Sequence, residues 1–169
     1  RLLIGCRIPP YTDPRFEAMD LCTQILGQGR GSRLYRSLVR EQRLARDATS
    51  YAYPLVTGGS MLLVWVTGYP DTDLQALEAA VFAEMDAMAR VGEAEVERAR
   101  TLASAREVRG MESLAERADV VSMTTTLFND PARVNGTLAR IAAVETGEVR
   151  RMAARFLGAD NRAVVAYRP

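Results

Sequence analysis

The sequence predicts an α+β fold of two layers, in which a small, mostly antiparallel sheet has helices packed on one face. Strand-like segments lie at both ends of the chain and in one internal hairpin, whereas the residues between the hairpin and the last strand are mostly helical. The chain has 169 residues, of which 48% are hydrophobic and 25% are charged. This composition is typical of a soluble globular protein, and we expect residues 1–169 to form a single domain.

The first quarter of the chain predicts one strand and two helices. Leu2–Ile8 is apolar and partly alternating, and two prolines end it, which is typical of a strand with one buried face. Asp13 is expected to cap a helix, because a proline follows it and apolar residues recur at helical spacing up to Gly27. The glycine-rich segment 27–31 then joins this helix to a second one, which Ser32 opens.

A β-hairpin and a closing strand supply the rest of the predicted sheet. Residues 47–57 have β character, and two glycines then turn the chain into the apolar run 61–67. Residues 162–167 form the last predicted strand, which we expect to pair back with the first one. Helices are predicted between the hairpin and this strand, with starts at Asp71, Glu93, Ser113, Asp130 and Thr146.

The inventory of side chains excludes several classes of chemistry. All 22 basic residues are Arg, so the chain has neither Lys nor His. Without His there is no Ser–His or Cys–His dyad and no His-containing zinc motif, and without Lys there is no P-loop lysine and no Schiff base. We therefore predict no catalytic residue and no metal ligand in this chain. Five aromatic side chains are interpreted as core or interface residues: Tyr11, Tyr35, Tyr51, Tyr53 and Trp65.

The compartment is not predicted beyond a soluble protein of the cytoplasm or periplasm. Cys6 and Cys22 lie in apolar stretches rather than in a CxxC pair, so we interpret them as reduced core residues, with a disulfide as the alternative. No apolar run reaches about 18 residues, which predicts no transmembrane helix. The first residues lack a basic-then-apolar leader, although a leader on a longer parent is left open.

The glycine cluster at residues 27–31 has three interpretations. It lies between two predicted helices, lacks the GxGxxG order and is followed by no Lys, which favours a helix C-cap and a turn over a phosphate loop. The alternatives are a mobile loop that touches a ligand and, less favoured, phosphate binding.

Four arginines are expected to share one face of the second helix. At 100° per residue, Arg33, Arg36, Arg40 and Arg43 fall within an arc of about 80°. This stripe is interpreted as a solvated face, with an acidic peptide or protein partner and a nucleic acid as alternatives. The formal net charge of +1 and the lack of interleaved aromatics disfavour nucleic acid.

The segment from Ile25 to Ala45, ILGQGRGSRLYRSLVREQRLA, resembles the "ILGGG-SSRLY-LR-E-LA" segment of the insulinase-like, or pitrilysin-type, zinc metallopeptidases, which include the mitochondrial processing peptidase. The segment RIP followed by Asp13-Pro14, and the segment VETGEV near the end, resemble further parts of the same family in the same order. The resemblance implies two similar α+β halves around a chamber, of which one has an inverted H-x-x-E-H zinc motif. A chain without His resembles the other half, the inactive C-terminal one.

The resemblance also implies partners and substrate contacts. Zinc would belong to a metal-bearing N-terminal half or partner subunit, and this half would close the chamber and help to hold an extended peptide. Many active members place an Arg and, seven residues later, a Tyr in this half to contact substrate. Those positions are Val39 and Arg46 in an ungapped match, or Arg40 and Arg46 with one deletion, and neither register supplies the Tyr. The candidate substrate-binding residues are therefore Arg40 and Arg46, with Arg33 and Tyr35 of the same segment.

Two other functions are weighed against this one. The missing Arg–Tyr pair favours a structural subunit without peptidase role, like the core-protein relatives in respiratory complexes. A nucleic-acid-binding module that uses the arginine stripe is the third hypothesis, and it predicts binding that weakens steeply with salt.

Overall fold

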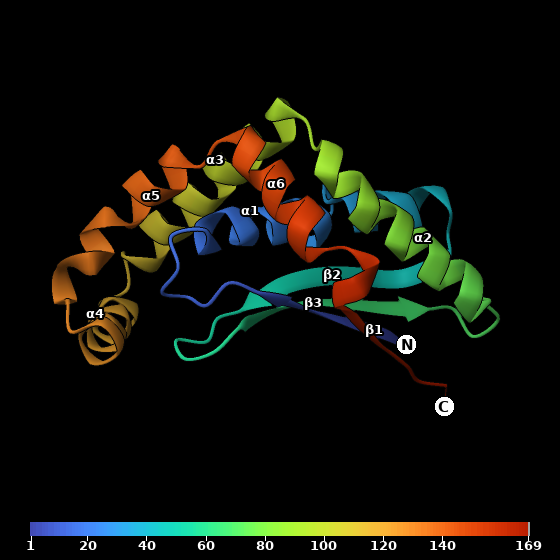
Figure 1. Cartoon of the computed structure of the whole chain (residues 1–169), viewed down its shortest axis with the longest axis horizontal. Helices are drawn as coiled ribbons and strands as arrows, with labels where there is room; N and C mark the ends of the chain where they lie inside the picture. The colour runs from blue at the N-terminus through green and yellow to red at the C-terminus, as the bar shows by residue number, and fades with distance from the viewer. Residues whose placement is uncertain (169) are drawn as a thin grey trace.

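Strands from both ends of the chain meet in one sheet, as the sequence predicts. The computed structural model describes residues 1–168 (Figure 1). The sheet has the order β2-β3-β1-β4 and all neighbouring strands are antiparallel. The arginine at position 1 donates its terminal amino group to the carbonyl oxygen of Tyr167 at 2.7 Å, so the two chain ends lie together. The strands are β1 (Leu2–Ile8), β2 (Ala45–Tyr53), β3 (Ser60–Gly68) and β4 (Arg162–Ala166).

Most of the helices form the second layer, over one face of this sheet, whereas the helix at residues 114–128 lies beyond one end of the sheet (Figure 1). The α-helices are α1 (Phe16–Gly27), α2 (Leu74–Ala87), α3 (Glu93–Gly110), α4 (Leu114–Phe128), α5 (Thr137–Ala143) and α6 (Thr146–Phe156). A π-helix, η1 (Tyr35–Glu41), lies between α1 and β2, and short 3₁₀ turns are η2 (Met88–Arg90), η3 (Pro131–Gly136) and η4 (Ala159–Asn161). The predicted α+β two-layer class is confirmed. Among the described residues, no helix combines the length and the apolarity needed to cross a membrane.

Two of the predicted helix caps are wrong by about two residues. Asp13 accepts a hydrogen bond from the backbone N–H of Arg15 at 2.8 Å and so closes the turn before α1 rather than opening the helix itself. Asp73, and not Asp71, caps α2, because its carboxylate accepts from the N–H of Gln75 at 3.1 Å. Both acids of the DTD sequence can cap a helix in principle, and only the start of α2 selects between them.

The second predicted helix is short and wider than an α-helix. The N–H of Gln42 bonds to the carbonyl oxygen of Ser37 at 2.9 Å, which is the i→i−5 pattern of a π-helix. Arg43 has a φ of 55°, so the chain leaves the helix there in a left-handed turn. Ser32 precedes the helix as predicted, but its buried hydroxyl has no hydrogen-bond partner within residues 1–168.

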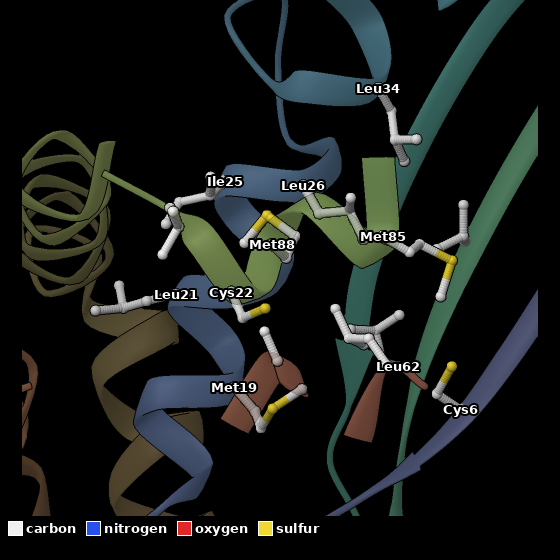
Figure 2. Packing of buried hydrophobic residues seen from close by; sticks show 14 of the residues in the cluster. Cys6, Met19, Leu21, Cys22, Ile25, Leu26, Leu34, Leu62, Met85 and Met88 are labelled. Carbon is white, nitrogen blue, oxygen red and sulfur yellow. The ribbon is translucent and has the colours of Figure 1, made fainter. Parts of the chain in front are cut away.

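The core lies between the sheet and the helices. Alternate residues of β1 point into it, and Cys6 of β1 and Cys22 of α1 are both buried there as free thiols (Figure 2). The disulfide alternative is therefore wrong, and the reduced interpretation is confirmed. Burial in apolar surroundings raises the pKa of Cys6 to about 11 and the pKa of Cys22 to about 12, so both thiols stay protonated at neutral pH.

The face of the sheet opposite the helices is covered by no element within residues 1–168 (Figure 1). In register across it lie Trp65 of β3, Leu3 of β1 and Val165 of β4. The side chain of Trp65 is 39% exposed. We call this surface the outer sheet face; its large exposed residues are Tyr51, Tyr53, Met61, Trp65 and Val165. Core is thus the wrong interpretation for Tyr51, Tyr53 and Trp65, whereas an interface role stays a prediction.

Candidate functional site

The end of α1 packs directly on the backbone of β2. A Cβ atom on Gly27 would lie 2.3 Å from the nitrogen of Ser50 and 2.7 Å from the carbonyl carbon of Thr49, so only glycine fits. The hydroxyl of Ser50 donates to the carbonyl oxygen of Thr23 at 2.7 Å, which adds a hydrogen bond to the same contact. The glycine-rich segment that follows therefore starts from a fixed point of the fold.

Two further glycines shape this segment for different reasons. Gly29 has a φ of +77°, a left-handed conformation that is strained for residues with a side chain. Gly31 instead makes room for Arg98 of α3, whose guanidinium donates to the carbonyl oxygen of Gly31 at 2.7 Å. The C-cap and turn interpretation agrees with this geometry, because the N–H of Gln28 bonds to the carbonyl oxygen of Gln24 at 3.1 Å.

Arg33 forms a bidentate ion pair with Glu95 of helix α3. Its Nε and Nη2 atoms donate to Oε1 and Oε2 of Glu95 at 2.8 and 2.7 Å, and only 13% of its side chain is exposed. Glu95 also accepts from the N–H of Gly92 at 3.1 Å and so closes the first turn of α3. The hydrogen bonds from Arg33 hold the pKa of the Glu95 carboxyl below its ordinary value. This ion pair fixes the start of the 33–46 segment against the helix layer.

We expect Glu95→Gln to lower the free energy of unfolding at pH 7 by about 1–2 kcal/mol, because a charge-assisted pair is lost at a site that is 29% exposed. The pKa of Glu95 is lower in the folded than in the unfolded chain. Its ion pair therefore contributes fully to stability above about pH 4.3, and this contribution is lost as the pH falls through the pKa of the folded chain. Urea unfolding at pH 7 and pH 3 measures this. The difference in free energy of unfolding between wild type and variant should be smaller at pH 3 than at pH 7. An equal difference at both pH values contradicts the account. Glu112→Gln, at an exposed position, is the control.

Arg40 and Arg46 are both exposed, on either side of the turn between η1 and β2. The pairing of β2 with β3 shifts register between Ala45 and Asp47, so Arg46 lies in a β-bulge of an edge strand. A bulge re-aims the side chain of the extra residue. Tyr35, at the start of η1, is half-buried.

The predicted arginine stripe is wrong as a continuous face. The π-helix has a wider turn than the 100° rule assumes, and Arg43 lies beyond its end. Arg33 is engaged by Glu95, and Arg36 lies 3.7 Å from Glu41. Arg40 is exposed and differs from Arg33 and Arg36 in having no ion pair within residues 1–168.

Sequence reasoning missed a second group of arginines, on α3. Arg98, Arg106 and Arg109 follow an i, i+8, i+11 pattern that places them along one side of the helix, next to the glycine-rich segment. The spacing was visible in the sequence. Its significance was not, because only the packing of α3 against α1 brings these side chains to residues 28–31.

The donor set of this chain does not fit a zinc ion. Among residues 1–168, no three Cys, Asp or Glu side chains converge as ligands, and the sequence has no His. Both thiols are buried in the core with raised pKa values, which opposes the thiolate form that zinc requires.

Comparisons with known proteins identify a family to which the sequence is similar. The family described as the peptidase M16 inactive domain matches residues 1–102, which is more than half of the chain. No curated protein matches the sequence.

Solved structures share the fold at low sequence identity. The inactive peptidase domain of a candidate zinc protease from Bordetella parapertussis has a TM-score of 0.88 at 20% identity, over 99% of this chain and 91% of that one. A protease from Helicobacter pylori has a TM-score of 0.87 at 21% identity, over 96% of this chain. A chain of complex III2 from Candida albicans has a TM-score of 0.80 at 13% identity, over 96% of this chain and 41% of that one. The chain spans only 40% of the length of the Helicobacter protease.

Proposed function

The chain belongs to the peptidase M16 inactive-domain family, and from this premise we propose that residues 1–169 are the single-domain, non-catalytic C-terminal half of a zinc-dependent endopeptidase. In this proposal the half closes the substrate chamber and helps to hold an extended peptide. The zinc ion and the general base belong to a metal-bearing N-terminal half or partner subunit. The observation that carries the proposal is the family match in a chain without His.

The exposed arginines after the glycine-rich segment support a role in holding peptide. A guanidinium offers several N–H donors in one plane, which suits the carbonyl oxygens of an extended peptide. Arg40 and Arg46 are exposed and available for such contacts. Arg33 is bonded to Glu95, so we assign it to positioning the segment that contains Arg40 and Arg46. Tyr35 is the first residue of η1 in the same segment. Strand β2 is an edge strand, so it also offers unpaired backbone groups to an extended chain.

We expect Arg40→Gln with Arg46→Gln to lower kcat/KM of the assembled peptidase about tenfold to a hundredfold, since each lost charge-assisted hydrogen bond is worth about 1.5 kcal/mol. Steady-state cleavage of an unstructured peptide measures the effect. Arg117→Gln with Arg151→Gln removes the same charge at exposed positions on α4 and α6, and should change kcat/KM less than twofold. A double variant of Arg40 and Arg46 that is as active as wild type contradicts direct contact with substrate.

The outer sheet face supports association with the metal-bearing half. It is a row of aromatic and aliphatic side chains that no element of residues 1–168 covers, and soluble monomers rarely leave such a surface free. The Helicobacter protease is much longer than this chain, so a protein of that kind has room for a second half. We therefore propose that the metal-bearing half of the same peptidase covers the outer sheet face.

A purely structural subunit is the second candidate function. The sequence lacks the Tyr of the Arg–Tyr pair, and the fold is shared with a chain of complex III2 from Candida albicans. An assembled protein that cleaves peptides at the same rate with and without the Arg40 and Arg46 side chains favours this candidate. A large loss in kcat/KM favours the peptidase half.

The parent protein offers a direct check on the proposal. We expect an H-x-x-E-H motif either upstream in the same chain or in the product of an adjacent reading frame. Sequencing the surrounding gene measures this, and the absence of the motif from both places contradicts the proposal.

A further inference from the structure

A pocket of about 400 Å³ lies where the end of α1, the glycine-rich segment and α3 meet. Gln24 and Ile25 of α1 form one wall, and Ala99 and Leu102 of α3 form the opposite one. The pocket opens to solvent beside residues 28–31, whose path Gly29 and Gly31 make possible. It is separate from Arg40 and Arg46, which do not line it.

Every charged side chain that lines this pocket is an arginine. They are Arg30, Arg98, Arg106 and Arg109, and no Asp or Glu is among the lining residues. Arg98 donates to the carbonyl oxygen of Gly31, a neutral group, whereas Arg106 is paired with two carboxylates, Asp20 at 3.1 Å and Glu107 at 3.7 Å. The guanidinium groups of Arg30 and Arg109 have no hydrogen-bond or ion-pair partner within residues 1–168, and both residues are exposed. The pocket therefore has positive charge that the fold does not neutralise.

The same pocket has an apolar side. Leu102 is 53% exposed there, and Ile25 and Ala99 are buried beside it. No aromatic side chain lines the pocket, so it offers no surface on which a nucleobase stacks. Guanidiniums around an exposed leucine instead match a carboxylate next to an aliphatic side chain, as an acidic peptide presents them.

We propose that this pocket binds an acidic segment of a peptide, with Arg30 and Arg109 as the carboxylate donors and Leu102 as the contact for a neighbouring aliphatic side chain. The inference rests on the proposed function, because it names the chemistry of peptide that this half selects. It adds a second contact region, on α3, to the one that contains Arg40 and Arg46.

Fluorescence anisotropy tests the proposal with residues 1–169. The probe is a fluorescein-labelled peptide of alternating Glu and Leu, and its counterpart has Gln in place of every Glu. We expect the acidic peptide to bind at least tenfold more tightly than the Gln peptide, and equal affinities overturn the proposal. The assay needs neither zinc nor cleavage, so its failure is distinguishable from a failure of the assembled peptidase.

Substitutions of the pocket residues test whether the acidic peptide binds there. Arg30→Gln with Arg109→Gln should weaken the acidic peptide about tenfold or more, because both free donors are lost. Arg117→Gln with Arg151→Gln removes the same net charge elsewhere and should change the Kd less than twofold. Leu102→Glu alters an exposed side chain and should abolish binding while the melting temperature stays close to wild type. Equal weakening by both double variants, or displacement of the peptide by inorganic phosphate at low millimolar concentration, overturns the proposal in favour of a nonspecific anion surface.

Discussion

Replacing Gly27 with alanine is expected to lower the free energy of unfolding by about 3 kcal/mol and the melting temperature by about 6–12 °C. Alanine is normally the better helix former, so the same substitution in an open helix stabilises by about 0.5–1 kcal/mol. At Gly27 the new methyl group would meet the backbone of Ser50 at 2.3 Å, and backbone atoms cannot rotate away as a side chain does. Either α1 or β2 must shift, and the bond from the Ser50 hydroxyl to Thr23 is lost with it.

Thermal and urea unfolding of Gly27→Ala measure this cost. Gly5→Ala is the matched control, because its Cβ would meet Leu63 at an ordinary distance of 3.6 Å in the middle of β1. The free energy of unfolding of that variant should lie within about 0.5 kcal/mol of the wild-type value. If Gly27→Ala is equally stable, the close approach of α1 to β2 is not a feature of the protein in solution.

Replacing Trp65 with threonine is expected to weaken association with the proposed metal-bearing half about thirtyfold or more, while the chain keeps its fold. Trp65 lies at the centre of the outer sheet face, between Leu3 of β1 and Thr49 of β2. Central aromatic side chains of interfaces cost about 2 kcal/mol or more when they are truncated. Threonine keeps the β-propensity of the strand, so the loss of stability should stay small.

Isothermal titration of the two halves measures this Kd. Leu138→Thr serves as the control, because Leu138 is 44% exposed and lies on helix α5, which is not part of the outer sheet face. It should bind like wild type. A Trp65→Thr variant that binds equally well contradicts the assignment of the outer sheet face to this partner.

The fold follows from local patterns that tertiary contacts do not override. The alternation of Leu2–Ile8 and the apolar run at residues 162–167 were enough to predict two strands, and their pairing brings the chain ends together as expected. The hairpin was visible because two glycines separate two β-rich runs. Helix starts were less certain, since Asp71 and Asp73 have the same capping chemistry and the backbone chooses between them.

The candidate site was less predictable, because its geometry depends on contacts that are distant in sequence. The residue that binds Arg33 is Glu95, 62 positions away. A π-helix cannot be distinguished from an α-helix by apolar spacing over seven residues. The sequence alone therefore predicts an arginine stripe that extends beyond the end of the helix at Glu41. The alternation of β3 likewise identifies two faces without showing that only one of them is covered by helices.

The most direct measurement is peptidase activity of this chain mixed with the proposed metal-bearing half, together with the zinc content of each. The account predicts that this chain alone is inert and holds no stoichiometric zinc, that the metal-bearing half alone cleaves poorly, and that the mixture cleaves unstructured peptides. Stoichiometric zinc in this chain alone would contradict the account, and so would a zinc-loaded partner whose kcat/KM is unchanged when this chain is added.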